Sequence, residues 1–494
     1  MNLSASFIEY TRSLLGDEEY EKLVSALSAE PPVSIRTNQA KLGNRNQQEN
    51  LPVLADPVPW ASEGYYLNGR LTFTFDPLFH AGCYYVQEAS SMFVEQALRK
   101  YVSEPVVMLD LCAAPGGKST HARAVLPEGS LLVANEVIRN RSQILAENLT
   151  KWGHPDVVVT NNDPSDFSSI NSFFDVILTD VPCSGEGMFR KDPGAIEEWS
   201  PENVEVCWQR QRRIIKDIWP CLKPGGMLIY STCTYNTKED EENILWMQQE
   251  LGAELLPVNI REEWKITGNL LNQNDYPVYR FLPHRTKGEG FFLAAVRKPE
   301  LEDGDGNRSF DSNSRYYLGN NSSSNSKKKN KKGGNAASLV SKDNLAQAKG
   351  WINFTDEYDV YAEETSLMAF PQQYAGELSV LKQSLRVVQA GLKIGEVKGK
   401  DLLPDHALAM NRLLKQDAFP MSEIGYDQAI AFLRKEAIVL SPDTPKGYVL
   451  LTYQQVPLGF VKNIGNRANN LYPQEWRIRS GYLPDEVLTI TGTR

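Results

Sequence analysis

Two cysteines in the middle of the chain stand where they can act on one substrate. Cys183 lies in the segment DVPCSGEG (180–187) and Cys233 in the segment YSTCT (230–234). Each segment follows a short apolar run, and such runs bounded by turn residues indicate buried strands of a parallel sheet. Loops at the carboxyl ends of the strands form the ligand crevice of an open α/β sheet. We therefore expect both thiols to face one crevice, with covalent, redox and metal chemistry still open.

A glycine-rich loop upstream of the cysteines is suited to binding a cofactor. It spans residues 110–119, between an expected strand and an expected helix. Glycine at such a turn lets backbone N–H groups approach a ligand closely, and the helix N-terminus favours the anionic end of that ligand. A P-loop would need glycine at position 112, where this chain has Cys112. The phosphate cradle of a nucleotide triphosphatase is therefore not built.

Two acidic residues favour an adenosine cofactor at this loop. Glu136 lies 20 residues after Gly116 and just past the second expected strand, where a carboxylate can accept hydrogen bonds from ribose hydroxyls. Asp163 follows the third strand and is placed to meet the adenine edge. Each acid alone is more often a helix cap or a turn former than a ligand. Together with the loop, at the ends of consecutive strands, they predict a cofactor site.

Composition narrows the class of protein. A chain of 494 residues with 41% hydrophobic and 23% charged residues is typical of a globular protein of about three domains. The net charge of -10 argues weakly against a general nucleic-acid coat but leaves RNA open, because recognition depends on local patches. The start of the chain shows no signal-peptide pattern, and no apolar run is long enough to span a bilayer. We expect a soluble cytoplasmic protein, a monomer that makes no membrane contact.

The six cysteines have no metal-binding spacing. There is no C-x-x-C pair, and only five histidines accompany them. We therefore expect no metal site and a reducing compartment in which free thiols can serve chemistry. Three of the cysteines, Cys83, Cys207 and Cys221, are expected to be small buried hydrophobic residues.

Periodicity and turn signals divide the chain into five parts. Alternating strands and helices in the second part predict a doubly wound, Rossmann-like parallel sheet, so the fold class is α/β. Later in the chain, apolar spacing predicts helices over 402–414 and 426–435. The expected parts are an N-terminal α+β module (1–80), the main α/β domain (81–300), a polar linker (301–335), an intermediate α/β module (336–435) and a C-terminal mixed α/β module (436–494).

Several basic residues are candidates for contacts with a polyanion. The lysine run at 327–332 can hold an RNA backbone loosely, although a solvated tether is favoured. Residues 441–494 carry six basic and four acidic side chains, a local charge of +2, interleaved with aromatic residues. This pattern is typical of a module whose basic residues bind the RNA backbone and whose aromatic residues stack on bases. An ordinary solvated face is an equally good interpretation. Arg36, on an expected strand, is either a phosphate contact or a solvated arginine.

Four segments resemble, in order, the signature motifs of the Nop/Sun family of RNA cytosine-5 methyltransferases. They are YYVQEASSM (84–92), LCAAPGGK (111–118), DVPCSGEG (180–187) and YSTCT (230–234), and the resemblance covers roughly residues 84–297. The part from 457 to 479 resembles the PUA-like RNA-binding module of the bacterial RsmF-type branch, which methylates small-subunit ribosomal RNA. Val181 stands where alanine is usual and Ser119 where threonine is usual, and both changes are small.

The resemblance implies the chemistry and the roles of the residues. It implies an S-adenosylmethionine-dependent enzyme whose partner is RNA, either ribosomal RNA or a ribosomal subunit assembly particle. Cys233 would attack carbon 6 of cytosine as the nucleophile, Cys183 would assist release of the methylated base, and Asp180 would hydrogen-bond the pyrimidine ring. Lys118 would add positive potential or cap the site. The expected cofactor-binding residues are Cys112, Ala113, Ala114, Pro115, Gly116, Gly117, Lys118, Glu136, Arg141, Asp163 and Asp180.

Two alternatives stay open. The substrate could be transfer RNA, or the chain could be a non-catalytic RNA-binding assembly factor that keeps the cofactor fold. The presence of Asp180, Cys183 and Cys233 together argues against the second alternative. A thiol with an unperturbed pKa near 8.5 is only about 3% ionised at pH 7, so Cys233 needs nearby positive charge or hydrogen-bond donors. The sequence does not identify them.

Overall fold

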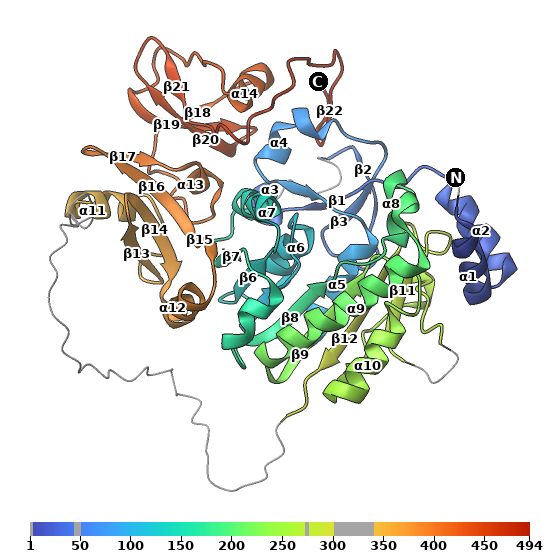
Figure 1. Ribbon diagram of the computed structural model, residues 1–494. Coiled ribbons are helices and arrows are strands. Elements are labelled where there is room, and N and C mark those ends of the chain that lie inside the picture. The colour runs from blue at the N-terminus through green and yellow to red at the C-terminus, as the bar shows by residue number, and fades with distance from the viewer. Residues whose placement is uncertain (1–2, 44–50, 272–275, 301–339) are drawn as a thin grey trace, which may run out of the picture.

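The computed structural model describes residues 3–43, 51–271, 276–300 and 340–494. Within these ranges a nine-stranded central sheet is accompanied by three four-stranded sheets and a two-stranded ribbon (Figure 1). The expected polar linker, 301–335, and the lysine run at 327–332 inside it lie outside the described residues.

The middle of the central sheet consists of five parallel strands in the order β9-β8-β5-β6-β7. Successive side chains face opposite cores: Met108 and Ile229 belong to one, Leu109 and Leu228 to the other. Strand order that runs outward in both directions from β5 confirms the expected doubly wound, Rossmann-like sheet. The strands are β5 (Val107–Asp110), β6 (Leu131–Asn135), β7 (Val157–Thr160), β8 (Phe174–Asp180) and β9 (Leu222–Thr232).

Antiparallel strands complete this sheet beyond β9. The long strand β12 pairs with β9 and carries two short strands on its other side. They are β10 (Glu254–Leu256), β11 (Val278–Phe281) and β12 (Phe291–Arg297).

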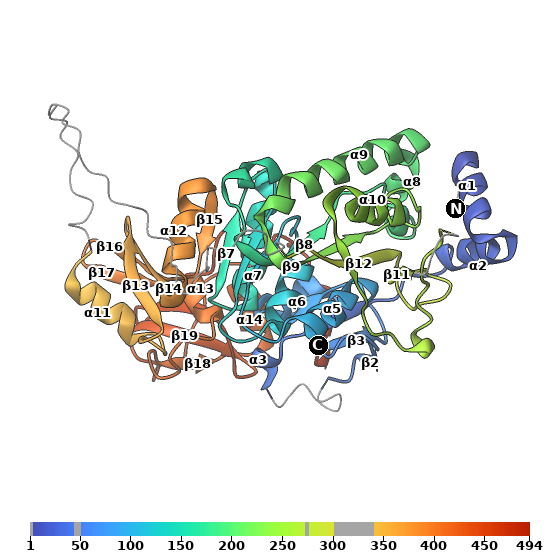
Figure 2. The ribbon, with the colours of Figure 1, turned by 90° about the horizontal axis from the view of Figure 1, so that it is seen from below.

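Helices cover both faces of the central sheet. Figure 2 shows α9 and α10 over one face and α5 and α6 over the other. The start of α9 is set by Ser200, whose hydroxyl accepts the Asn203 N–H, and by Pro201 at the first helical position. In the described ranges no helix is long and apolar enough to cross a membrane. The helices are α5 (Val94–Tyr101), α6 (Gly117–Val125), α7 (Arg139–Trp152), α8 (Pro193–Glu198), α9 (Pro201–Ile218) and α10 (Glu241–Leu251).

The N-terminal part begins with two helices, and Gly16 between them has φ +80°, a conformation that favours glycine. An antiparallel sheet in the order β2-β3-β1-β4 follows. Its elements are α1 (Ala5–Leu15), α2 (Asp17–Leu27), β1 (Ser34–Thr37), α3 (Gln39–Leu42), β2 (Leu54–Pro57), β3 (Gly64–Leu67), α4 (Pro77–His80) and β4 (Tyr84–Val86).

Arg36 on β1 is buried, so both expectations for it were wrong. Only 1% of its surface is exposed. Its guanidinium donates to Gln87 Oε1 at 3.0 Å and to Thr120 Oγ1 at 2.6 Å, and it stacks on the Trp152 ring at 4.1 Å. Burial lowers its pKa to about 9. Arg36 therefore ties the N-terminal sheet to α6 and α7 rather than touching solvent or a phosphate.

The intermediate module contributes a strand to the central sheet. Strand β15 pairs antiparallel with β7 at the sheet edge, and Leu378 and Leu381 of α12 join the apolar core beneath it. The other strands form a separate sheet in the order β13-β14-β16-β17. The elements are α11 (Lys342–Gly350), β13 (Tyr358–Glu363), β14 (Ser366–Pro371), α12 (Ala375–Ser384), β15 (Val387–Ala390), β16 (Leu392–Lys398), β17 (Asp401–Pro404) and α13 (His406–Met410).

The helix expected over 402–414 was wrong. Leu402 and Leu403 lie in β17, which pairs with β16. Pro404 lacks the N–H needed to continue the strand, and Asp405 then caps the short helix α13 by accepting the Ala407 N–H. The apolar spacing thus came from two short elements instead of one helix.

The last part of the chain packs against the N-terminal module. The buried Asp76 carboxylate accepts hydrogen bonds from the Tyr84 hydroxyl at 2.9 Å and the Ile490 N–H at 2.8 Å, joining the two. The helix expected over 426–435 is present as α14. The elements are β18 (Met421–Glu423), α14 (Tyr426–Leu433), β19 (Gly447–Tyr453), β20 (Val456–Asn463), β21 (Ala468–Asn470), β22 (Leu488–Thr489) and β23 (Gly492–Thr493).

Two aromatic rings of the basic terminal segment pack inside the protein, whereas Tyr482 is 70% exposed. Phe460 is 1% exposed, and Trp476 packs edge-on against His406 with ring centroids 5.2 Å apart. Base stacking on RNA by this segment therefore stays a prediction. Arg467 and Arg479 are exposed. They are therefore available for the expected contacts with RNA phosphates.

Replacing Arg36 tests its structural role. Arg36→Ala removes two buried hydrogen bonds and the stacking contact with Trp152, and we expect the free energy of unfolding to fall by about 3 kcal/mol. Arg70→Ala, an exposed arginine in the same part of the chain, is the control and should change stability by less than about 0.5 kcal/mol. Equal effects of the two substitutions in urea denaturation would contradict the role assigned to Arg36.

Candidate active site

Five parallel strands end at one edge of the central sheet, and most of the expected site residues lie there. The register places Asp110 level with Ala134 of β6 and Leu178 of β8. Asp180 at the end of β8 is level with Ser231 of β9. Each cysteine loop follows one of these two strands directly. The pairing of β8 with β9 therefore brings together two loops that are 50 residues apart in the sequence.

The glycine-rich loop turns sharply between β5 and α6. Gly116 has φ +116°, and a Cβ built there would lie 3.3 Å from Leu145, so a side chain would be strained. Arg141 donates to the Ala114 carbonyl at 2.8 Å and Asn148 to the Pro115 carbonyl at 2.7 Å, which holds the loop against α7. Helix α6 then begins at Gly117. Its first N–H groups have no intrahelical acceptors, an arrangement that binds anions.

Glu136 and Arg141 lie beside this loop. Glu136 is 3% exposed; its Oε1 accepts the Ile138 N–H at 2.8 Å, and Arg141 Nη1 lies 3.5 Å from its Oε2. Arg141, one of the expected cofactor-binding residues, thus contacts both the loop and the acid, and its contact with a cofactor stays a prediction. Cys112 in the loop is a poor nucleophile, because burial raises its thiol pKa far above the usual range.

Asp163 is engaged in local contacts. It caps the 3-10 turn that follows β7 by accepting from Ser165, and it pairs with Arg213 of α9 at 3.1 Å. The hydrogen bond from Arg213 lowers the pKa of Asp163. The expected contact with an adenine edge stays a prediction.

Lys118 and Asp180 form an ion pair at the mouth of the site. Lys118 Nζ lies 2.8 Å from Asp180 Oδ2, and the Ser231 hydroxyl donates to Asp180 Oδ1 at 2.9 Å. Burial opposes the charge on Lys118, but the negative charges of Asp180, Asp110 and Cys233 outweigh it and raise the pKa of Lys118. Lys118 is therefore a permanent cation close enough to Cys233 for their charges to interact.

The two cysteines are in direct contact. The Sγ atoms of Cys183 and Cys233 are 3.0 Å apart, and the Cys233 N–H donates to Cys183 Sγ at 3.3 Å. The hydrogen bond with Cys233, followed by burial, raises the pKa of Cys183 well above its usual value. Cys183 therefore holds its proton more tightly than a free thiol does. As expected, Cys83, Cys207 and Cys221 are buried thiols.

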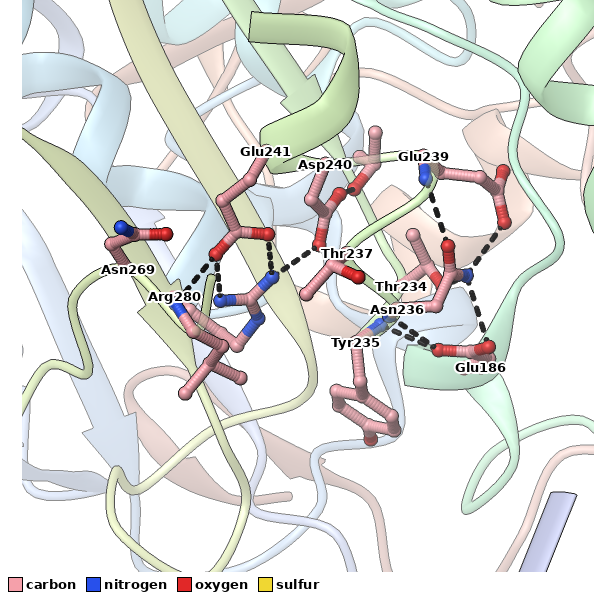
Figure 3. Close-up of polar contacts among 12 residues, drawn as sticks. Glu186, Thr234, Tyr235, Asn236, Thr237, Glu239, Asp240, Glu241, Asn269 and Arg280 are labelled. Atoms are coloured by element: carbon pink, nitrogen blue, oxygen red, sulfur yellow. Dashed lines mark hydrogen bonds and ion pairs between the residues drawn. The ribbon is translucent and has the colours of Figure 1, made fainter. Parts of the chain in front are cut away.

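Sequence reasoning missed three buried polar residues, Glu186, Asn236 and Glu239, that lie in or beside the two cysteine loops. Figure 3 shows Asn236 between the carboxylates of Glu186 and Glu239, with dashed contacts to both. Glu186 is in the motif of Cys183 and Asn236 stands three positions after Cys233, so proximity to the motifs was the available signal. Polar side chains in a loop are normally solvated, which is why they attracted no interpretation.

Three family models match this chain. The model described as 16S rRNA methyltransferase RsmB/F matches residues 98–297, and the model for the N-terminal domain of 16S rRNA methyltransferase RsmF matches residues 3–89. A third, the methyltransferase RsmF PUA domain, matches residues 420–478. The matched ranges include the glycine-rich loop, both cysteine loops and the terminal sheet.

Whole-chain relatives and solved structures point the same way. Ribosomal RNA small subunit methyltransferase F of Serratia proteamaculans (strain 568) is 29% identical over 97% of this chain and 98% of that protein. The protein of the same name from Escherichia coli O81 (strain ED1a) is 30% identical over 86% of this chain and 85% of its own length. A methyltransferase homologue from Pyrococcus horikoshii matches with a TM-score of 0.52 and 29% identity, over 60% of this chain and 95% of that one.

Asp110 provides a pH test of the edge of the sheet. Burial raises its pKa to about 7, against a hydrogen bond from Ser119 and the charge of Lys118, while Asp180 and Glu136 add to the increase. The folded-state pKa exceeds the unfolded one, so the stability Asp110 contributes is present below about pH 4 and is lost as the pH rises through about 7.

Asp110→Asn removes this titration. As the pH rises from 5 to 8, the free energy of unfolding of the variant should increase relative to that of the wild type by about 1 kcal/mol or more. Urea denaturation of ligand-free protein measures this difference. The exposed Asp343→Asn serves as the control. A wild-type-minus-variant difference that stays constant over this pH range would refute the buried, proton-binding state of Asp110.

Proposed function

This chain belongs to the RsmF-type branch of the Nop/Sun methyltransferases, and we propose that it methylates carbon 5 of cytosine in small-subunit ribosomal RNA through a covalent cysteine adduct. It is an S-adenosylmethionine-dependent methyltransferase. The observation that carries the proposal for carbon 5 is the contact between Cys183 and Cys233, whose sulfurs are 3.0 Å apart beside the Lys118–Asp180 ion pair. Transfer to a ring or sugar heteroatom would need no thiol pair.

S-adenosylmethionine, when bound, supplies an electrophilic methyl group on a sulfonium. The donors and acceptors at the sheet edge fit its parts: the N–H groups at the start of α6 suit a carboxylate, and the buried Glu136 suits ribose hydroxyls. The residues proposed to hold it are Cys112, Ala113, Ala114, Pro115, Gly116, Gly117, Lys118, Glu136, Arg141, Asp163 and Asp180.

Cys233 is proposed as the nucleophile because carbon 5 of cytosine alone is a weak one. Its thiolate bonds to carbon 6, and the displaced electron pair makes carbon 5 enamine-like, so carbon 5 can take the methyl group. The carbon 5 proton is then lost to solvent, its bonding pair re-forms the carbon 5–carbon 6 double bond, and the carbon–sulfur pair returns to the Cys233 sulfur as the bond breaks. Splitting one difficult step into easier ones is the benefit of covalent catalysis.

The neighbours of Cys233 support this assignment. The Lys118 ammonium is close enough to Cys233 for their charges to interact, and Cys183 Sγ lies 3.0 Å from Cys233 Sγ. Cys183 keeps a proton that can return to the departing thiolate, which fits a role in release. Asp180, held by Ser231 and Lys118, is proposed to hydrogen-bond the pyrimidine ring.

RNA binding is proposed for the modules that surround the catalytic sheet. We propose that residues 436–494 act as the RNA-binding module, in which the exposed Arg467 and Arg479 are available to phosphates. Residues 1–80 and 336–435 are proposed to support this module around the catalytic domain at 81–300. Flipping a base out of a duplex costs a few kcal/mol, so a loop or an incompletely assembled ribosomal subunit in the cytoplasm is the proposed target.

Substitution of the two cysteines should have opposite signatures. Cys233→Ala should abolish methyl transfer from labelled S-adenosylmethionine to 16S ribosomal RNA, a loss of at least 10³-fold. Cys183→Ala should leave the nucleophile but slow release, so that a protein–RNA adduct survives denaturing gel electrophoresis.

The buried Cys207→Ala on α9 is the matched control and should stay active without an adduct. Activity of Cys233→Ala would remove the covalent mechanism. Transfer of methyl groups to transfer RNA in preference to 16S ribosomal RNA would replace the proposed substrate, and bisulfite sequencing of the product shows whether carbon 5 is modified.

A further inference from the structure

Two buried carboxylates, Glu186 and Glu239, hydrogen-bond to the cysteine loops. Glu186 is 1% exposed and Glu239 is less than 1% exposed. In the part of the chain that the structure describes, neither forms an ion pair with lysine, arginine or histidine. Uncompensated buried charges are costly unless hydrogen bonds satisfy them. Neutral donors must therefore hold both groups.

Asn236 is the donor shared by the two carboxylates. Its Nδ2 donates to Glu186 Oε1 at 3.0 Å and to Glu239 Oε1 at 2.8 Å, while its Oδ1 accepts the Glu239 N–H at 2.8 Å (Figure 3). The same Nδ2 lies 2.7 Å from Thr234 Oγ1. A neutral amide supplies the donor and the acceptor at once. Aspartate here would place a third negative group between two others.

Each carboxylate holds a different part of the site. Glu186 lies in the loop of Cys183 but accepts the Tyr235 N–H at 2.6 Å and the Asn236 N–H at 3.0 Å, so it binds the loop of Cys233. Glu239 follows Cys233 but accepts the Ser184 N–H at 3.0 Å, so it binds the loop of Cys183. The two bridges cross, and Asn236 joins them at the centre.

The electrostatic state of the cluster depends on this amide. Burial and the Glu186 charge raise the pKa of Glu239 to about 7, while hydrogen bonds from Ser184, Asn236 and Gln211 lower it. The other titratable groups that interact with Glu186 or Glu239 are Tyr10, Cys183, Cys207, Tyr230, Tyr235 and Asp240. Without Asn236, the Glu239 carboxylate loses one of its donors beside a like charge, and its hold on the Cys183 loop weakens.

We propose that Asn236 is a positioning residue for release of the product: by bridging Glu186 and Glu239 it holds the Cys183 loop against Cys233, so that Cys183 can act on the adduct. This inference rests on the proposed covalent function. Asn236 acts through the loops and does not itself touch the reacting atoms. Its loss should therefore resemble loss of Cys183 more than loss of Cys233.

A neighbouring buried cluster provides the matched control. Arg280, fully buried on β11, pairs with Asp240 at 3.0 Å and with Glu241 at 2.6 Å (Figure 3). These contacts anchor the start of α10 and do not reach the Cys183 loop. Glu241→Gln weakens a buried polar cluster in the same segment of chain and should lower stability without a specific effect on release.

The first test follows the adduct. With 16S ribosomal RNA and S-adenosylmethionine, Asn236→Ala should lower kcat at least tenfold, leave KM for RNA within about twofold, and accumulate at least fivefold more denaturation-resistant adduct than wild type. Glu241→Gln should show no such accumulation. If Asn236→Ala does not fold, Glu239→Gln, which removes one acceptor from the same bridge, should give the same accumulation.

Loss of activity without adduct in a folded Asn236→Ala, while Cys183→Ala does accumulate it, would overturn the inference and leave the proposed function intact. Absence of adduct in Cys183→Ala together with an active Cys233→Ala would instead overturn the proposed function.

The second test needs no RNA. Diamide oxidises two adjacent thiols to a disulfide and is itself reduced to the hydrazine. At a sulfur separation of 3.0 Å, wild type and Glu241→Gln should form the Cys183–Cys233 disulfide rapidly, as read by peptide mass spectrometry. Asn236→Ala should form it at least tenfold more slowly. Equal rates in all three proteins would show that Asn236 does not hold the cysteines together, and would overturn the inference.

Discussion

Parallel pairing of β8 with β9 is the constraint on which the active site depends. The backbone bonds continue past the strands, since the Val181 N–H donates to the Ser231 carbonyl at 3.0 Å and the Gly187 N–H to the Cys233 carbonyl at 2.8 Å. A slip of one residue would turn every side chain of the strand to the opposite face. The contact between the two sulfurs is thus a consequence of register, and the buried hydrogen bonds around it make that register specific.

Burial shifts the pKa values of several groups at this site. It raises the pKa of Asp110, adds to the hydrogen bond with Cys233 that raises the pKa of Cys183, and opposes the charge of Lys118, which Asp180 and the other negative groups nearby stabilise. Removing a partner from such a group costs more than the hydrogen bond alone contributes, because a buried polar group is left unsatisfied. Function and stability are therefore coupled at the sheet edge, and substitutions here need controls of equal burial.

Local patterns in the sequence predicted the central sheet and the loops at its edge, because strands buried on both faces are continuous apolar runs and the glycine loop has few conformations available. Contacts between distant segments were not predictable in this way. Strand β15 pairs with β7 from the far side of the linker, and Arg36 is buried only because α6 and α7 close over it. Nor could spacing reveal that Asn236 lies between two carboxylates, since their convergence depends on the tertiary fold. The helix expected over 402–414 failed for a simpler reason, as Pro404 separates two short elements.

The most direct test of the account is to identify the atom that bonds to the RNA. Replacing cytidine with 5-fluorocytidine removes the carbon 5 proton that must leave, so a carbon 6 adduct formed by the wild-type protein cannot resolve after methyl transfer. After digestion, tandem mass spectrometry should place the methylated nucleotide on the peptide that contains Cys233. Attachment to the peptide that contains Cys183, or full methylation of 16S ribosomal RNA with no covalent species on the fluorinated substrate, would contradict the account.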